Sequence, residues 1–395
     1  MKRLFIFSQW MEIDGVEASL LGLLKELDYS QVSVDLFLTL HQGPWMSEIP
    51  REVNLLPEHP RVVLYASSLE RLKREGHWGA FLLTQVARYL AAIWYRVFLR
   101  RKVDFVGYEQ VKYAVWAPFL PKRLSQKWYD GALIFGGEAG FARRVRAKFS
   151  AVWIHSDWSH YAPIVWLGRF AYRHIDKIVN VSQSAKKAFD CRYPSARQRS
   201  VVVENLLSSK WMVARSLVRE IPAFSGLKIL SVGRLSAQKR MSRAVAAAKL
   251  LKAQGLHFQW RVVGDGEEAK MLRDLIQQEK VEDVFFLEGA TDNPMPYYPW
   301  CDIYVCTSDW EGKSVSVREA QIFAKPVVIT RFPTASSQLE EGVDGLIAEC
   351  TPESVAEKIL TLAQDLPLRE RLSVTCCQRD YANLKEIDKI LSWMS

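Results

Sequence analysis

Residues 227–239 read LKILSVGRLSAQK. The first six form a short apolar run that predicts a buried strand, Gly233 then turns the chain, and a helical pattern follows at 241–254. A strand that passes through a glycine turn into a helix is the opening of a βαβ unit. This order predicts a parallel sheet with helices on its faces.

The same alternation of short apolar runs and amphipathic stretches extends along the whole chain. In the first half we predict strands at 3–8, 32–38, 103–107, 131–135, 151–154, 176–181 and 201–203. In the second half we predict strands at 227–232, 258–263, 284–287, 302–306, 326–330 and 345–348, with helices at 241–254, 267–279, 315–323 and 352–366. The fold class expected from this pattern is α/β.

The alternation breaks near Asn205, and residues 206–226 read as an irregular linker. We therefore predict two Rossmann-like, doubly wound domains. The first spans 1–205 and is joined by a C-terminal helix within 381–395; the second spans 206–380. Ligands of such sheets bind beyond the carboxyl ends of the strands, so we expect the site in a cleft between two facing domains.

Composition excludes several classes of protein. The chain has 395 residues, 49% hydrophobic and 25% charged, which is typical of a globular protein and not of a disordered one. The longest low-charge apolar run, 90–99, is interrupted by Arg96 and is about half of the ~20 residues that a membrane span needs. The N-terminal residues reach acidic side chains early, so we expect no signal peptide.

Cysteine and histidine patterns predict a reduced compartment and no metal. None of the six cysteines forms a CxxC pair, which favours a cytoplasmic location. The seven histidines show no metal-ligand spacing, so no metal or other cofactor is expected.

The net charge of +9 is unevenly distributed. Residues 1–205 carry 29 Lys and Arg against 19 Asp and Glu, whereas residues 206–395 carry 24 against 25. The basic first half is expected to face an anionic partner such as phosphate, nucleic acid or a lipid surface.

Three loops of the second half carry candidate chemistry. After the strand at 227–232, Arg234 and Lys239 could meet a diphosphate near a helix N-terminus, or they could be two solvated loop cations. After the strand at 258–263, Gly264-Asp265-Gly266 favours a structural turn, with Gly264 near a bound nucleotide as the alternative.

The third loop is the most informative. In TSDWEGKSVSVREA (307–320), Glu311 precedes the expected helix and Glu319 lies on its second turn, so both carboxylates can point to one side and accept sugar hydroxyls. The amides of Lys313, Ser314 and Val315 at the helix start can bind an anion or a sugar oxygen. Ordinary surface acids are the alternative interpretation.

Taken together, these motifs resemble retaining glycosyltransferases of the GT-B fold, specifically the GT4 group. The resemblance rests on Gly15 after the first strand, Gly233-Arg234-Leu235 with Lys239, Gly264-Asp265-Gly266, and Glu311 and Glu319 separated by seven residues. Residues 153–157 (WIHSD) are similar to the family's first-domain histidine region. The resemblance covers nearly the whole chain and is strongest over 151–350.

The resemblance implies a role for each motif. It implies that Arg234 and Lys239 clamp the donor diphosphate, that Glu319 holds the ribose and that Glu311 contacts the transferred sugar. The remaining implied site residues are His155 beside that sugar, Gly15 near the donor phosphate, Gly233 and Gly264 in the donor loops, and the backbone of Lys313, Ser314 and Val315. Lys313-Ser314 departs from the family's usual aromatic-Gly pair, and Arg240 stands where Gly often follows the clamp lysine.

The expected reaction is hexosyl transfer from a nucleoside-diphosphate sugar, a UDP-sugar first, to a hydroxyl of a saccharide or lipid-linked saccharide, as in bacterial surface-polysaccharide assembly. The resemblance implies retention of configuration and no required metal. A GT-B epimerase or an inverting transferase are alternatives. A basic nucleic-acid-binding protein is an alternative from another class, although no nucleic-acid recognition motif supports it.

Two basic stretches of the first half, 69–102 and 143–148, raise the question of a membrane. They interleave arginine and lysine with aromatic residues, which suits peripheral contact with an anionic membrane at the inner face of the plasma membrane. The alternative is a helix whose apolar face packs in the core and whose basic face is solvated. Glu138, in Gly136-Gly137-Glu138, is a further cleft candidate, with a plain helix start as the alternative.

Overall fold

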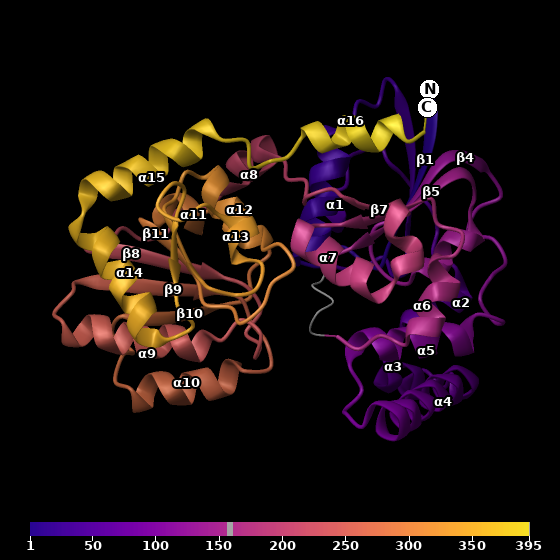
Figure 1. Ribbon diagram of the computed structural model, residues 1–395, viewed down its shortest axis with the longest axis horizontal. Coiled ribbons are helices and arrows are strands. Elements are labelled where there is room, and N and C mark those ends of the chain that lie inside the picture. The colour runs from indigo at the N-terminus through magenta and orange to yellow at the C-terminus, as the bar shows by residue number, and fades with distance from the viewer. Residues whose placement is uncertain (156–160, 395) are drawn as a thin grey trace. The chain divides into compact units, whose positions relative to one another are not determined.

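Two parallel β-sheets organise the structure, one in each half of the chain (Figure 1). In the computed structural model, which describes residues 1–155 and 161–394, the chain divides into two units. Unit 1 comprises Met1–Glu204 together with the returning residues 385–394, and unit 2 comprises Asn205–Leu384.

The sheet of unit 1 has seven strands in the order β3-β2-β1-β4-β5-β6-β7. Their bounds are β1 (Lys2–Ser8), β2 (Val32–Leu38), β3 (Asn54–Leu55), β4 (Trp128–Ile134), β5 (Arg146–Ile154), β6 (Lys177–Asn180) and β7 (Ser200–Val202). β1 is buried from Leu4 to Ser8. Helices cover both faces of a parallel sheet, which explains why its central strand is a continuous apolar run.

Helices of unit 1 begin where the sequence supplies capping side chains. Asp14, Ser68, Asp104 and Ser182 each accept a backbone N–H at the start of the helix that follows. These helices are α1 (Gly15–Glu26), α2 (Pro60–Ala66), α3 (Leu69–Arg74), α4 (Trp78–Trp94), α5 (Phe105–Trp116), α6 (Val165–Tyr172) and α7 (Gln183–Arg192). Shorter turns are η1 (Pro44–Glu48), the π-helical η2 (Tyr95–Leu99), η3 (Ala139–Arg144) and η4 (Pro194–Arg199).

The last helix, α16 (Lys385–Ser392), packs on unit 1 although unit 2 precedes it in sequence. Lys2 Nζ donates to the Leu391 carbonyl at 2.9 Å, and the Trp393 ring lies 5.7 Å from the Phe149 ring. The chain therefore returns to its first domain, as the sequence predicts.

The sheet of unit 2 has six strands in the order β10-β9-β8-β11-β12-β13. They are β8 (Leu227–Val232), β9 (Phe258–Val263), β10 (Phe285–Gly289), β11 (Ile303–Cys306), β12 (Val327–Thr330) and β13 (Leu346–Ala348). The helices are α8 (Ser209–Ser216), α9 (Met241–Ala253), α10 (Ala269–Gln278), α11 (Tyr297–Trp300), α12 (Val315–Ile322), α13 (Ala335–Gln338), α14 (Pro352–Gln364) and α15 (Leu366–Gln378). Trp260 is fully buried at the centre of this core.

The predicted fold class, two Rossmann-like α/β domains, is confirmed. Two local predictions are wrong. Residues 103–107 do not form a strand, because the Asp104 carboxylate accepts the Gly107 N–H at 2.9 Å and thereby starts α5. The stretch 206–226 is not wholly irregular, because Ser208 caps the helix α8 through the Trp211 N–H.

Each sheet reverses its strand order once. The reversal lies between β1 and β4 in unit 1 and between β8 and β11 in unit 2, since consecutive strands run outward from these pairs in both directions. At such a point the connections leave in opposite directions and open a crevice at the carboxyl ends of the strands. Each unit therefore has one place where its architecture favours a ligand.

Candidate functional site

Three loops of unit 2 leave the carboxyl ends of neighbouring strands. β8 pairs in parallel with both β9 and β11, so the residues after Val232, Val263 and Cys306 emerge side by side. These loops carry the glycine-arginine-lysine stretch, the Gly-Asp-Gly turn and the two glutamates that the sequence singles out.

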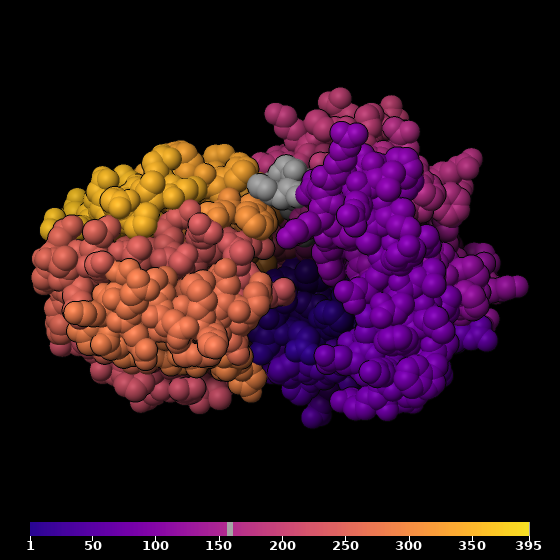
Figure 2. All heavy atoms as spheres, turned by 90° about the horizontal axis from the view of Figure 1, so that it is seen from below, coloured from indigo at the N-terminus to yellow at the C-terminus, as the bar shows by residue number. Residues whose placement is uncertain are grey.

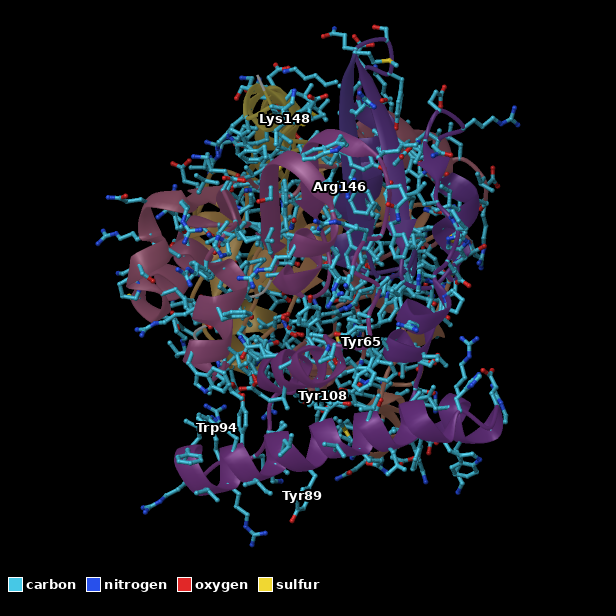
Figure 3. All side chains as sticks on the ribbon, turned by 90° about the vertical axis from the view of Figure 1, so that its right-hand side faces the viewer. Tyr65, Tyr89, Trp94, Tyr108, Arg146 and Lys148 are labelled. Carbon is cyan, nitrogen blue, oxygen red and sulfur yellow. The ribbon has the colours of Figure 1, made fainter. Side chains whose placement is uncertain are left out.

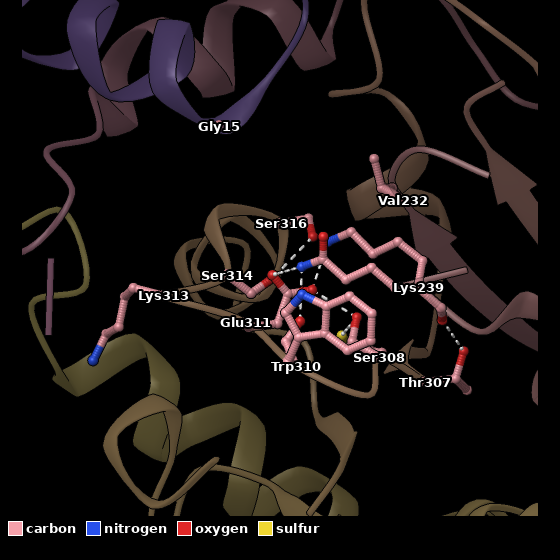
Figure 4. A network of polar contacts seen from close by, with 12 residues as sticks. Gly15, Val232, Lys239, Thr307, Ser308, Trp310, Glu311, Lys313, Ser314 and Ser316 are labelled. Carbon is pink, nitrogen blue, oxygen red and sulfur yellow. Dashed lines mark hydrogen bonds and ion pairs between the residues drawn. The ribbon is translucent and has the colours of Figure 1, made fainter. Parts of the chain in front are cut away.

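An ion pair joins the first and third loops. Lys239 Nζ lies 2.7 Å from Glu311 Oε1, and the two side chains are 17% and 8% exposed (Figure 4). Ser308 Oγ donates to the same carboxylate oxygen at 2.6 Å. Gln238 Nε2 is 3.5 Å from Glu311 Oε2 and donates to the Trp310 carbonyl at 2.7 Å. The carboxylate is thus held in place by side chains from both loops.

Backbone contacts fix the spacing of these two loops. The Thr307 hydroxyl donates to the Lys239 carbonyl at 3.0 Å, and the Asp309 N–H donates to the Gln238 carbonyl at 2.9 Å. Arg243, on α9, donates to the Thr307 carbonyl at 2.6 Å and forms a 2.7 Å ion pair with Asp309. The Lys239–Glu311 pair is therefore part of a rigid framework and not a chance meeting of surface side chains.

Two glycines let the first and second loops touch. Gly264 has a φ of +140°, and a β-carbon there would stand 2.0 Å from the Gly233 carbonyl oxygen. Gly233 has a φ of +153°, and its β-carbon would stand 3.2 Å from Lys239 Cε. Gly264 needs glycine for this close backbone approach, and Gly233 for its positive φ, which agrees with the structural interpretation of the Gly-Asp-Gly turn.

Glu319 is buried on α12 and accepts a short hydrogen bond from the Tyr298 hydroxyl. Burial raises its pKa to about 7, against the smaller opposing effects of this hydrogen bond and of Lys239. The Tyr298 ring is stacked between those of Tyr304 and Phe323, at centroid distances of 5.9 and 5.5 Å. The carboxyl group is thus positioned by an aromatic stack.

The start of α12 differs from the sequence-based expectation. The Ser314 N–H is not free, because it donates to Gln338 Oε1 at 2.8 Å, and the Gln338 amide donates back to the Ser314 carbonyl. The Lys313 side chain is buried, and its ammonium donates to the Ser337 carbonyl. In Figure 4 it points away from Glu311.

The other predicted residues of unit 2 lie on the same loops. Arg234 is exposed on the β8 loop, and Val315 is the first residue of α12. Arg240, which follows Lys239, adopts a left-handed conformation with φ of +50°, which explains why glycine suits this position.

Two predicted residues belong to unit 1. Gly15 is the first residue of α1, and its N–H donates to the Asp14 carboxylate at 2.6 Å. His155 follows β5, and its Nε2 lies 2.8 Å from the Phe135 carbonyl, so this nitrogen carries the proton. Of the predicted histidine region, Ser156 and Asp157 lie outside the described residues.

Sequence reasoning missed the residues that hold the site together. Ser308, Gln238, Tyr298 and Gln338 contact predicted residues but carry no motif of their own. Gln238 and Ser308 lie close to motif residues in the sequence, and this closeness is the signal by which they could have been found. Tyr298 and Gln338 come from α11 and α13, and nothing in the sequence connects these elements to Glu319 or Ser314.

The two basic stretches of unit 1 behave differently from each other. Arg144 donates to the carbonyls of Leu120, Pro121 and Ala117, and Lys148 forms a 2.8 Å ion pair with Asp130. Figure 3 shows Arg146 and Lys148 at the far end of unit 1 from α4. The stretch 143–148 is therefore not continuous with the surface of α4, and its contact with a membrane stays a prediction.

On α4 and η2 the large apolar side chains face outward. A row at helical spacing is exposed by at least two fifths of its surface, whereas the opposite face is lined by Ala80, Thr84, Ala87, Ala91 and Tyr95. The exposed row, here called the α4 row, comprises Trp78, Leu82, Val86, Tyr89, Leu90, Ile93, Val97 and Phe98. Figure 3 shows Tyr89 pointing away from the unit, and Figure 2 shows the purple α4 segment on its surface.

One apolar face of this segment does pack in the core, through Ala80, Ala87, Ala91 and Tyr95, but the opposite face is not simply basic, because it carries the exposed apolar row. The buried side chains of α4 itself are small, whereas the exposed ones are mostly bulky. Over the described residues, no helix is both long and apolar enough to span a bilayer. Within the same residues, no three His, Cys, Asp or Glu side chains are grouped as a metal site would need.

Comparison with known proteins agrees with this geometry. Residues 221–375, most of unit 2, match the family model described as "Glycosyl transferases group 1". The amylovoran biosynthesis glycosyltransferase AmsK of Erwinia amylovora is 31% identical over 147 residues, which cover 35% of this chain and 36% of AmsK. The chain spans 35–36% of the length of AmsK and of two further curated relatives. The matched residues lie within the second predicted domain, 206–380.

Solved structures share the fold over both units. Anabaena Alr3699/HepE in complex with UDP-glucose aligns with a TM-score of 0.66 at 16% identity and covers 99% of this chain and 100% of that one. A variant of TarM from S. aureus, in complex with UDP and alpha-GlcNAc-glycerol among others, aligns with a TM-score of 0.68 at 13% identity over 100% of both chains. These likenesses show the two-domain fold.

Proposed function

We propose that this chain, whose residues 221–375 match a glycosyltransferase family model, moves a hexosyl group from a UDP-sugar to a hydroxyl of a saccharide or lipid-linked saccharide. The proposal includes retention of anomeric configuration and a role in polysaccharide biosynthesis. The observation that carries it is the Lys239–Glu311 pair at the switch point of unit 2, where the fold favours a ligand.

The proposed donor site follows from the charges of the three loops. Arg234 and Lys239 bind the diphosphate, Lys239 from its position beside Glu311. Glu311 contacts the transferred sugar through Oε2, the oxygen not held by Lys239 and Ser308. Glu319 accepts the ribose hydroxyls. Gly233 and Gly264 bring the backbone close, and Gly15 and His155 of unit 1 are proposed as further donor residues.

The chemistry proposed is electrostatic. When the bond between the anomeric carbon and the diphosphate breaks, negative charge develops on UDP, and Arg234 and Lys239 stabilise it. The acceptor oxygen bonds to the anomeric carbon, and its proton passes to the leaving phosphate. The proposal assigns the charge stabilisation to these cations and requires no metal ion. Glu311 and Glu319 position the donor and do not act as an acid–base pair.

The α4 row supports a peripheral membrane contact as part of the proposed function. A continuous apolar stripe on a surface helix is unfavourable in water and suits burial at the acyl boundary of a bilayer. Four cations, Arg96, Arg100, Arg101 and Lys102, are clustered at the end of this stripe and favour anionic lipids.

The test is transfer from a panel of radiolabelled UDP- and GDP-sugars by the full chain, with a membrane extract as acceptor. Label should move from a UDP-sugar into the extract, and the product anomer should match the donor. Conversion of the donor without acceptor would indicate an epimerase, and an inverted anomer an inverting enzyme. Tight, salt-sensitive DNA binding without UDP-sugar binding would overturn the proposal.

A further inference from the structure

Two adjoining cavities lie in unit 1, beyond the carboxyl ends of β1 and β2. The larger has a volume of about 960 Å³ and is walled by α4, α5 and the segment between α2 and α3. The smaller has a volume of about 80 Å³ and lies beyond the ends of β1, β2 and β4, next to Gln9, Thr39 and Glu138. Trp10, Ala66, Phe105 and Lys112 line both, so the two cavities share a wall.

Glu138 is the distinctive group of the smaller cavity. No hydrogen bond from a described residue reaches its carboxyl group, although its neighbour Glu109 pairs with Lys112 at 3.4 Å. Burial and the proximity of Glu109 raise the pKa of Glu138 to about 8. At neutral pH it therefore carries a proton and can both donate to and accept from a ligand hydroxyl.

The larger cavity is lined by aromatic rings and cations. Trp10, Phe105 and Tyr108 offer flat apolar surfaces of the kind on which the C–H face of a sugar ring packs. Arg88, on α4, lines this cavity, is exposed, and makes no hydrogen bond or ion pair with a described residue. Its guanidinium suits a phosphate oxygen pair.

The cavity and the α4 row belong to the same helix. Arg88, Thr84 and Ala92 line the cavity, and Tyr89 and Leu90 are exposed in the row. Figure 3 shows Tyr108 on the inner side of α4 and Tyr89 on its outer side. A ligand that extends from Glu138 past Arg88 thus reaches the apolar surface after crossing one helix.

We propose that these cavities bind a saccharide carried on a phosphate-bearing lipid, with sugar hydroxyls at Glu138, the phosphate at Arg88 and the hydrocarbon chain along the α4 row. This inference rests on the proposed function, because it makes the bound molecule the acceptor. The proposed ligand carries hydroxyls, an anion and a hydrocarbon chain in the same order in which the protein presents Glu138, Arg88 and the α4 row.

The test measures binding of a defined probe, glucose 1-(dodecyl phosphate), to the full chain by calorimetry below the critical micelle concentration of the probe. Glucose 1-phosphate lacks the chain, and dodecyl glucoside lacks the phosphate. Each truncated probe should bind at least about 10-fold more weakly than the full probe. Equal affinity for all three probes would overturn the proposal.

Variants test which side chain binds which part of the probe. Glu138→Ala should weaken the full probe about 10-fold, Glu138→Gln should retain binding, and Arg88→Gln should weaken the full probe but not dodecyl glucoside. Glu52→Gln, an exposed acid of unit 1, is the matched control. Arg88 is exposed, so its variant decides the matter where Glu138→Ala fails to fold. Wild-type affinity in Arg88→Gln would contradict the inference.

UDP binding measured in the same samples separates this inference from the proposed function. UDP affinity should be unchanged in every variant, because Glu138, Arg88 and Glu52 are not among the proposed donor residues. If the wild type does not bind UDP, the proposed function is contradicted. The probe data are then judged separately. If the wild type binds UDP but neither Glu138→Ala nor Arg88→Gln changes the affinity for the full probe, only the cavity assignment is overturned.

Discussion

Lys239 Nζ and Glu311 Oε1 lie 2.7 Å apart although 72 residues separate them in the chain. Both side chains are largely buried, and the two loops that carry them leave adjacent parallel strands. A buried pair of opposite charges stabilises a fold only while both partners are present. The pair is therefore both a structural element and the centre of the proposed donor site, and variants can separate the two roles.

Removal of Lys239 alone should affect both stability and activity. Lys239→Met leaves the Glu311 carboxylate buried without its counter-ion, which should lower the free energy of unfolding by about 3 kcal/mol. The double variant Lys239→Met/Glu311→Gln should regain most of that stability. Neither protein should transfer sugar at more than about 10⁻² of the wild-type rate. Urea unfolding and a transfer assay measure the two effects.

Lys249→Met provides the control for that pair. Lys249 also forms an ion pair in unit 2, with Glu279 at 2.5 Å, but its side chain is 58% exposed. Its removal should change stability by less than about 1 kcal/mol and leave transfer intact. Full transfer activity in Lys239→Met would contradict the site assignment.

Glu319 should make stability depend on pH. Its pKa in the folded chain is about 7, above its ordinary value of 4.5, so folding favours the protonated form. The stabilisation is complete below about pH 4.5 and is lost as the pH rises toward 7. Between these values wild type should lose about 3 kcal/mol relative to Glu319→Gln, which cannot titrate. Urea titrations at each pH give the free energy of unfolding of both proteins. If the two curves of free energy against pH are parallel, Glu319 does not titrate as described.

Of two glycines with positive φ, Gly264 and Gly255, substitution by alanine should destabilise the chain more at Gly264. Gly264→Ala would place its β-carbon 2.0 Å from the Gly233 carbonyl oxygen and should lower the free energy of unfolding by about 3 kcal/mol or more. Gly255 has a φ of +74° with nothing within 4 Å, so Gly255→Ala should lower it by only about 1 kcal/mol. UDP affinity should fall in the first variant alone, because the loop carrying Arg234 must move.

The α4 row should bind vesicles that contain anionic lipid. Leu82→Gln/Leu90→Gln removes two exposed apolar side chains and should weaken partitioning to phosphatidylglycerol vesicles at least about 10-fold. The melting temperature should not fall, since neither residue packs in the core. Gln85→Ala, exposed on the same helix, should leave partitioning unchanged. Sedimentation with vesicles measures both, and equal partitioning of the two variants would exclude the row as the contact surface.

Much of the fold could be predicted from the sequence because local patterns carry it. The run LKILSV followed by Gly233 predicted β8 and its turn, since a buried parallel strand must be apolar throughout. Residues 103–107 were predicted as a strand but lead into α5. A short apolar run is ambiguous between strand and helix, and the Asp104 side chain settled it by capping α5.

The sequence by itself determined the two-domain α/β fold and the residue types of the candidate site, because hydrophobic periodicity and glycine turns are local properties of the chain. Tertiary structure alone decided which groups meet. It brought Tyr298 to Glu319 and closed the Ser314 N–H against Gln338, and it turned the bulky side of α4 outward. These outcomes depend on contacts between elements far apart in sequence, whose packing no local pattern encodes.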